Sequence, residues 1–359
     1  MLLRVKWGKI LKVMLFIDQF ILQQFLRAGL TAFITFALSM TLTPLFTYFA
    51  YKNKWWKNAR TTTWISNGKE DAEVYSSLHS SKHKRHIPTM AGILIWIPVA
   101  IITLVTNFDR TQTWLLLFAL VSVGILGLID DYINIKGLGA GIAGIKAKVK
   151  IGWLLAISFA GAFWFYFKLG RSFIDIPIIG VVNIKYWYIP LFILVVVSAA
   201  NAVNITDGLD GLSGGLLILA FGAYSIISLL QGYYGIAAFC ASIVGAVLSY
   251  TWFNIFPARF FMGDTGAVSL GATLGVVAML TDTVFLLPII ASVFVFETLS
   301  VIIQLISKKF FGKKVFLSAP IHHHLEAKGW PEPKVTMRFW VIGAISAVFG
   351  IVLNLLGKL

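Results

Sequence analysis

The chain has 359 residues, of which 58% are hydrophobic and only 13% are charged. Soluble domains typically carry roughly 25% charged residues, so this composition excludes an ordinary soluble fold and favours a membrane protein. The formal net charge of +15 does not require nucleic acid as a partner, because Lys and Arg gather in the cytoplasmic loops of membrane proteins. The single cysteine, Cys240, excludes a disulfide within the chain and a thiolate metal site.

The N-terminal segment combines Arg4, Lys6, Lys9 and Lys12 with apolar residues and has no small-residue cleavage site. We therefore expect no cleavable signal peptide. The segment predicts a cationic amphipathic helix over residues 1–24 that lies at the membrane interface.

Ten apolar stretches follow, most of them close to the roughly 20 residues that cross a bilayer. They predict an all-α polytopic membrane protein with spans over residues 25–50, 88–106, 113–129, 149–167, 186–200, 211–230, 235–253, 266–280, 285–306 and 337–357. The segment 174–184 is rich in Pro, Gly and β-branched residues and predicts a small β-hairpin. Because no internal repeat is visible, we expect residues 1–359 to form a single integral-membrane domain.

The polar connections between these spans differ in charge. The connections on one side, with the residues that adjoin them, hold 20 of the 30 Lys and Arg residues, whereas those on the other side hold 4. The excess of positive charge on the cytoplasmic side of membrane proteins places both termini and the hairpin in the periplasm. The loops expected in the cytoplasm are residues 51–87, 130–148, 201–210, 254–265 and 307–336.

Three acidic motifs lie where these loops meet the predicted spans: Asp130-Asp131, Asp207 with Asp210, and Asp264. A carboxylate at a membrane boundary is costly unless it is hydrated or paired, so we expect the three motifs to form one cytoplasmic active-site cleft. Each motif also has a simpler interpretation. Asp130-Asp131 would be a solvated helix end, and Asp207 and Asp264 would be helix caps.

The surroundings of these acids suggest a site for phosphates and a hard cation. Asn201 and Asn204 supply amide donors beside Asp207, and Gly-Asp-Thr-Gly before a span offers free backbone N–H groups to a phosphate. Oxygen ligands without cysteine favour Mg²⁺ over Zn²⁺ or a Ca²⁺ loop. Lys146 and Lys148 are the cations best placed to neutralise a diphosphate or the Asp130-Asp131 pair.

Three consecutive histidines, His322 to His324, lie in a second basic loop. Neighbouring side chains diverge, so the three are poorly suited to sharing one zinc ion. They are expected either to donate hydrogen bonds to phosphate oxygens or to be a surface run without function. Glu297 lies inside the ninth predicted span, and we expect it to be a buried structural residue that is hydrogen-bonded or protonated, with contact to the substrate as the alternative.

Five motifs together resemble the phospho-N-acetylmuramoyl-pentapeptide-transferase family, part of the polyprenyl-phosphate N-acetylhexosamine-1-phosphate transferases. The matching segments are PTMAGI at 88–93, the Asp pair at 130–131, NAVNITDGLDGL at 201–212, WFNIFPARFFMGDTG at 252–266 and PIHHHLEAKGWPEPKVTMRFW at 320–340. The triple histidine followed by GWPEP points to the muramoyl-pentapeptide member. This chain departs from the family by having Asn134 where Lys is usual, with Lys136 as a potential substitute, and Ala91 where Gly is usual.

The resemblance implies a homodimeric enzyme of the bacterial inner membrane with ten transmembrane helices. It would transfer phospho-N-acetylmuramoyl-pentapeptide from UDP to undecaprenyl phosphate with Mg²⁺, releasing UMP and forming lipid I for peptidoglycan, and so serve cell shape and cell division. By the same resemblance Asp264 holds the metal, and Asp130, Asp131, Asp264 and His323 are catalytic. The substrate-binding residues implied are Lys84, Lys146, Lys148, Asn201, Asn204, Asp207, Asp210, His322 and His324.

The residues leave the chemical route and two rival functions open. Asp130 acts as a base or orients the lipid phosphate, and a covalent aspartyl intermediate is the alternative. A sister transferase using UDP-N-acetylglucosamine would share every Asp motif. A transporter would need ionisable groups near the midplane of several spans, and only Glu297 fits that requirement.

Overall fold

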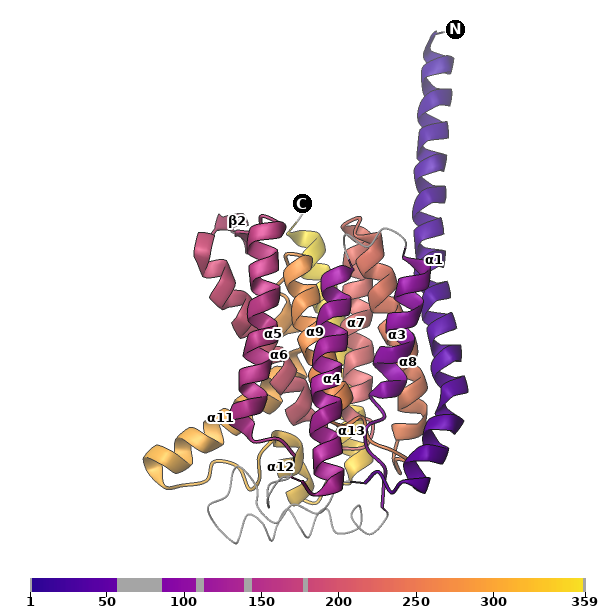
Figure 1. Cartoon of the computed structure of the whole chain (residues 1–359). Helices are drawn as coiled ribbons and strands as arrows, with labels where there is room; N and C mark the ends of the chain where they lie inside the picture. The colour runs from indigo at the N-terminus through magenta and orange to yellow at the C-terminus, as the bar shows by residue number, and fades with distance from the viewer. Residues whose placement is uncertain (1, 57–85, 108–112, 139–143, 177–179, 358–359) are drawn as a thin grey trace.

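The computed structural model describes residues 2–56, 86–107, 113–138, 144–176 and 180–357, with side chains from residue 19 onward. Its elements form one bundle of roughly parallel and antiparallel helices (Figure 1). The long elements are α1 (Leu2–Lys52), α3 (Ile93–Thr106), α4 (Trp114–Lys136), α5 (Ala147–Phe163), α6 (Tyr188–Thr206), α7 (Leu212–Leu230), α8 (Tyr234–Asn254), α9 (Gly263–Leu280), α11 (Ser292–Phe311) and α13 (Glu332–Leu356). The short ones are η1 (Trp164–Lys168), β1 (Phe173–Ile176), β2 (Gly180–Asn183), η2 (Lys185–Trp187), α10 (Leu287–Ile290) and α12 (Ile321–Ala327).

Eight helices within the described residues are long and apolar enough to cross a membrane. The spans predicted over 88–106 and 285–306 are not among them, and the number ten stays a prediction. The first of these two is shortened to the 14 residues of α3, because Pro88, Thr89 and Met90 run as non-helical chain before it. The second is divided at Ala291 into α10 and α11.

The first helix, α1, continues without a break across the predicted boundary between residues 24 and 25. Its N-terminal part projects beyond the end of the bundle (Figure 1). The placement of residues 1–24 at a membrane interface stays a prediction.

The predicted hairpin is confirmed. Strands β1 and β2 pair antiparallel, with Phe173 opposite Asn183 and Ile176 opposite Gly180. An ion pair between Arg171 and Asp282 ties the chain before the hairpin to the turn after α9. The hairpin and both chain ends lie at one end of the bundle, and α12 lies at the other (Figure 1).

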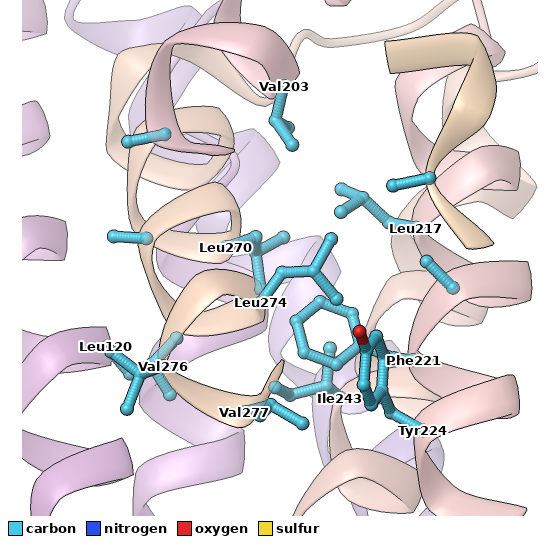
Figure 2. Packing of buried hydrophobic residues seen from close by; sticks show 14 of the residues in the cluster. Leu120, Val203, Leu217, Phe221, Tyr224, Ile243, Leu270, Leu274, Val276 and Val277 are labelled. Carbon is cyan, nitrogen blue, oxygen red and sulfur yellow. The ribbon is translucent and has the colours of Figure 1, made fainter. Parts of the chain in front are cut away.

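The core is centred on α9, whose residues from Gly263 to Leu280 are all buried. Leu270 and Leu274 of α9 lie near Phe221 and Tyr224 of α7 (Figure 2). Glycines bring the backbones together, since a Cβ at Gly271 would lie 2.5 Å from the carbonyl oxygen of Ala199 in α6. Small residues at helix contacts are typical of membrane bundles, where close packing replaces the hydrophobic driving force. This packing fixes the N-terminus of α9, where Asp264 lies.

Candidate functional site

Asp130 and Asp264 meet at the end of the bundle that carries α12, and a single cation joins them. Lys150, in the first turn of α5, has its Nζ 3.5 Å from Asp130 Oδ2 and contacts Asp264 Oδ2 directly. The Asp130 carboxylate also accepts a hydrogen bond of 2.6 Å from the backbone N–H of Ile145. Both aspartates are only 6% exposed. Burying two carboxylates is costly, and the ammonium group that they share offsets part of that cost.

Asp131 makes different contacts from those of Asp130. It is fully buried, and its Oδ2 accepts hydrogen bonds from the backbone N–H of Thr265 (3.0 Å) and from the Thr265 hydroxyl (2.7 Å). Thr265 lies in the first turn of α9, so Asp131 places a negative charge at the positive end of that helix. The structure thus separates the two carboxylates, as expected from the wide angle between adjacent helical residues.

The two aspartates do not lie at a helix end, as the predicted span 113–129 implied. Helix α4 continues to Lys136, more than a turn beyond Asp131. The simpler interpretation as a solvated helix end is therefore wrong. Asn134 is buried near this site, whereas Lys136 is exposed with its ammonium 5.9 Å from the ring centroid of Tyr132.

The second motif forms a tight turn between α6 and α7, which we call the glycine turn (residues 207–211). Asp207 ends α6 and accepts a hydrogen bond from the Ser213 hydroxyl, so it is not a helix N-cap. Asp210 accepts a bond of 2.9 Å from the backbone N–H of Ala258 and donates from its own N–H to Glu332 (2.6 Å). The last residue, Gly211, has φ +78°, a value that favours glycine.

The glycine turn and the Asp264 loop are connected through α8. Asn254 accepts a bond of 2.9 Å from Gly211 N and donates one of 2.9 Å to the carbonyl of Phe260. The hydroxyl of Tyr250 accepts a bond of 2.9 Å from Met262 N, two residues before Asp264. The three acidic motifs therefore lie at one end of the bundle, although Asp207 and Asp210 contact other groups than Asp130 and Asp264 do.

The three histidines diverge from α12 to three separate partners. His322 Nδ1 lies 2.9 Å from Glu297 Oε2, and His323 Nδ1 lies 2.8 Å from Glu326 Oε2. His324 accepts a hydrogen bond of 3.1 Å from Leu317 N. Burial and, after it, the charge of Lys328 lower the pKa of His324, which keeps that ring neutral and able to accept this bond. The expectation that Glu297 is buried and hydrogen-bonded is confirmed.

The remaining predicted residues lie at the edge of the site or outside the described part of the chain. Lys146 and Lys148 are exposed, and no described contact joins them to the carboxylates. Asn201 is exposed and donates to Val197 O within its own helix, whereas Asn204 is half-buried. Lys84 belongs to residues 57–85, which the structure does not describe.

Lys150 is not among the cations predicted from the sequence to neutralise the Asp130-Asp131 pair, which are Lys146 and Lys148. The available signal was its spacing. Lys150 follows Lys146 by one helical turn, on a helix whose first turn faces the acids.

The donors fit a hard cation held by few protein ligands. Asp130 and Asp264 offer carboxylate oxygens beside Lys150. Among the residues described, no three His, Cys, Asp or Glu side chains converge to hold a metal by themselves. That arrangement is compatible with Mg²⁺, which commonly takes one or two carboxylates and fills its coordination with water and substrate phosphates.

Comparison with known proteins agrees with the motifs. Residues 113–282 match the model of glycosyl transferase family 4. The phospho-N-acetylmuramoyl-pentapeptide-transferase of Chloroflexus aggregans is 38% identical over 350 residues, which is 94% of this chain and 92% of the relative. Enzymes of the same name from Geobacillus sp. and Bacillus anthracis are 39% identical over 334 and 332 residues, covering 90% and 89% of this chain and 96% of each relative. The chain belongs to the phospho-N-acetylmuramoyl-pentapeptide-transferase family.

Proposed function

We propose that this protein transfers phospho-N-acetylmuramoyl-pentapeptide from UDP to undecaprenyl phosphate, releasing UMP and forming lipid I. The reaction would be the first membrane step of peptidoglycan synthesis, carried out by a homodimer at the cytoplasmic face of the bacterial inner membrane. The observation that supports it best is the sharing of Lys150 between Asp130 and Asp264, which joins two of the family's acidic motifs in one buried site.

Mg²⁺ is the cofactor in this proposal, with Asp264 as its chief ligand and Asp130 beside it. Phosphoryl transfer depends mainly on positioning and on neutralising charge at the diphosphate, and a bound divalent cation supplies that neutralisation. The two carboxylates beside Lys150 support this assignment, since Mg²⁺ commonly takes one or two carboxylate ligands and completes its coordination with water and phosphates.

In the proposed mechanism Asp130 orients the lipid phosphate for attack on the phosphorus that carries the sugar. A phosphate monoester has a second pKa near 6 and is already largely dianionic at pH 7, so proton removal by Asp130 assists without being essential. Lys150 holds Asp130 and offers its ammonium to phosphate oxygens. Asp131 fixes the first turn of α9 and thereby the position of Asp264.

The test is UMP release by the purified protein from UDP-N-acetylmuramoyl-pentapeptide, with undecaprenyl phosphate and Mg²⁺. Asp130→Asn and Asp264→Asn should each slow turnover about 10²- to 10³-fold, because each removes a charge aimed at the reacting phosphates. The matched control is Asp175→Asn, an exposed carboxylate in the hairpin at the other end of the bundle. Near-full turnover by either site variant would reject the assignment.

The same assay separates the alternatives. Preference for UDP-N-acetylglucosamine as donor would favour the sister transferase, and liposome flux without UMP release would favour a transporter. A burst of UMP equal to the amount of enzyme, in the absence of lipid acceptor, would favour a covalent aspartyl intermediate over direct attack.

A further inference from the structure

Glu297 and His322 form a buried pair that the mechanism above does not use. Glu297 lies in α11 and His322 in α12, and both side chains are 0% exposed. His322 Nδ1 lies 2.9 Å from Glu297 Oε2. With the proton on Nδ1, the imidazole donates to the carboxylate and the other ring nitrogen, Nε2, is turned away from Glu297.

The Nε2 atom of His322 has no hydrogen-bond partner among the described residues. It faces the glycine turn so closely that a Cβ at Gly208 would overlap it. Gly208 is itself half-buried, so Nε2 lies beneath a turn that solvent reaches. A buried polar atom without a partner costs free energy, and native structures rarely keep one without a reason. A hydrogen-bonding group of the bound substrate would supply the missing partner of His322 Nε2.

We propose that Glu297 is a positioning residue that accepts a hydrogen bond from Nδ1 of His322 and fixes the orientation of the ring, so that the doubly protonated imidazole donates a hydrogen bond from Nε2 to a phosphate oxygen of the nucleotide sugar at the glycine turn. This inference rests on the proposed function. The carboxylate compensates the charge of the imidazolium that forms when Nε2 carries a proton, as carboxylate partners do for histidines in other active sites.

The position of Gly208 supports the proposal. It lies between Asp207 and Asp210 in the one turn that contacts Ser213, Ala258 and Glu332. A small shift of this turn on substrate binding would expose Nε2 to the phosphates. Any side chain at Gly208 would instead push the imidazole away, since it would occupy the space in front of Nε2.

The first experiment measures kcat and KM for UMP release by Glu297→Ala, with Ser300→Ala as its control. Ser300 lies one turn along α11, is also buried, and donates a hydrogen bond to the backbone carbonyl of Glu297. Glu297→Ala should lose about 10- to 100-fold in kcat/KM, the usual effect of removing an orienting carboxylate, whereas Ser300→Ala should stay near wild type. Equal activity of the two variants would overturn the proposal.

The second experiment distinguishes a positioning role of Glu297 from a purely structural one. It also tests the proposal if the Glu297→Ala protein does not fold. The amide of His322→Asn lies near the place of Nδ1 and keeps the bond to Glu297, whereas the amide of His322→Gln reaches toward the place of Nε2. We expect His322→Gln to retain more turnover than His322→Asn. The opposite order would overturn the inference, because the pair would then only hold α11 to α12. A wild-type protein that releases no UMP would reject the proposed function itself.

Discussion

Lys150 is the residue on which the charge balance of the site depends. Its ammonium group contacts Asp264 and lies 3.5 Å from Asp130, and its side chain is only 20% exposed. Removing one member of a buried ionic cluster leaves the others uncompensated, which is more costly than never having formed the pair. Lys150 would also compete with a divalent cation for the same carboxylate oxygens.

Lys150→Met should therefore slow UMP release by at least about 10²-fold while strengthening Mg²⁺ binding. Because a ligand that binds only the folded state raises the melting temperature, added Mg²⁺ should stabilise Lys150→Met more than the wild type. Thermal unfolding in detergent with and without Mg²⁺ measures this. The control is Lys168→Met, an exposed lysine beside the hairpin. Equal losses in Lys148→Met and Lys150→Met would contradict the central place given to Lys150.

At the scale of elements, the site depends on the close approach of α4 and α9. A Cβ added at Gly127 of α4 would overlap the carbonyl oxygen of Asp264 in α9. A Cβ at Gly92, before α3, would likewise overlap the backbone of Gly266. The carboxylates can thus meet only because three segments touch at glycines, where backbone contacts backbone.

Gly127→Ala should lower the melting temperature and the turnover together. Overpacking of a well-filled contact typically costs about 1–3 kcal/mol, and the relief available here is a shift of the first turn of α9, which carries Asp264. The matched control is Gly222→Ala in α7, where an added Cβ meets nothing within 4 Å. A melting temperature for Gly127→Ala equal to that of the control would show that the two helices separate without cost.

For the whole molecule, the bundle has two chemically different ends. One end carries the hairpin, the Arg171–Asp282 ion pair and both chain ends, and the other carries the carboxylates, the glycine turn and α12 (Figure 1). The distribution of Lys and Arg assigns the second end to the cytoplasm. That assignment is a prediction from the sequence.

Labelling of single cysteines in intact cells tests the orientation. The native Cys240 is fully buried and gives little background. Val181→Cys, 70% exposed in the hairpin, should react with a membrane-impermeant thiol reagent outside the cell. Leu317→Cys, 54% exposed near α12, should react only after the cells are opened. Reaction of both residues in intact cells, or the reverse pattern, would contradict the predicted orientation.

The membrane class, the hairpin, most of the helices and the family can be predicted from the amino-acid sequence alone. These follow from local properties, since apolar length marks a span and a motif stays recognisable wherever its residues fold. The apolar pattern did not indicate where α3 begins or that the helix predicted over 285–306 is divided. The chain before α3 bonds to another segment, since Pro88 and Ala91 pair with the backbone of Phe261 and Gly92 with that of Met262. The division at Ala291 separates α10 from α11.

Which charged side chains meet depends on how the helices pack. The packing brings Lys150, and not Lys146 or Lys148, into contact with the carboxylates. It also places Asp131 at the N-terminus of α9 and Glu297 beside His322. The reason is that hydrogen bonds and ion pairs depend on a few ångströms and on the direction of each side chain. Those quantities are fixed by how α4, α5 and α9 pack, and spacing along the chain indicates only which residues share a helix face.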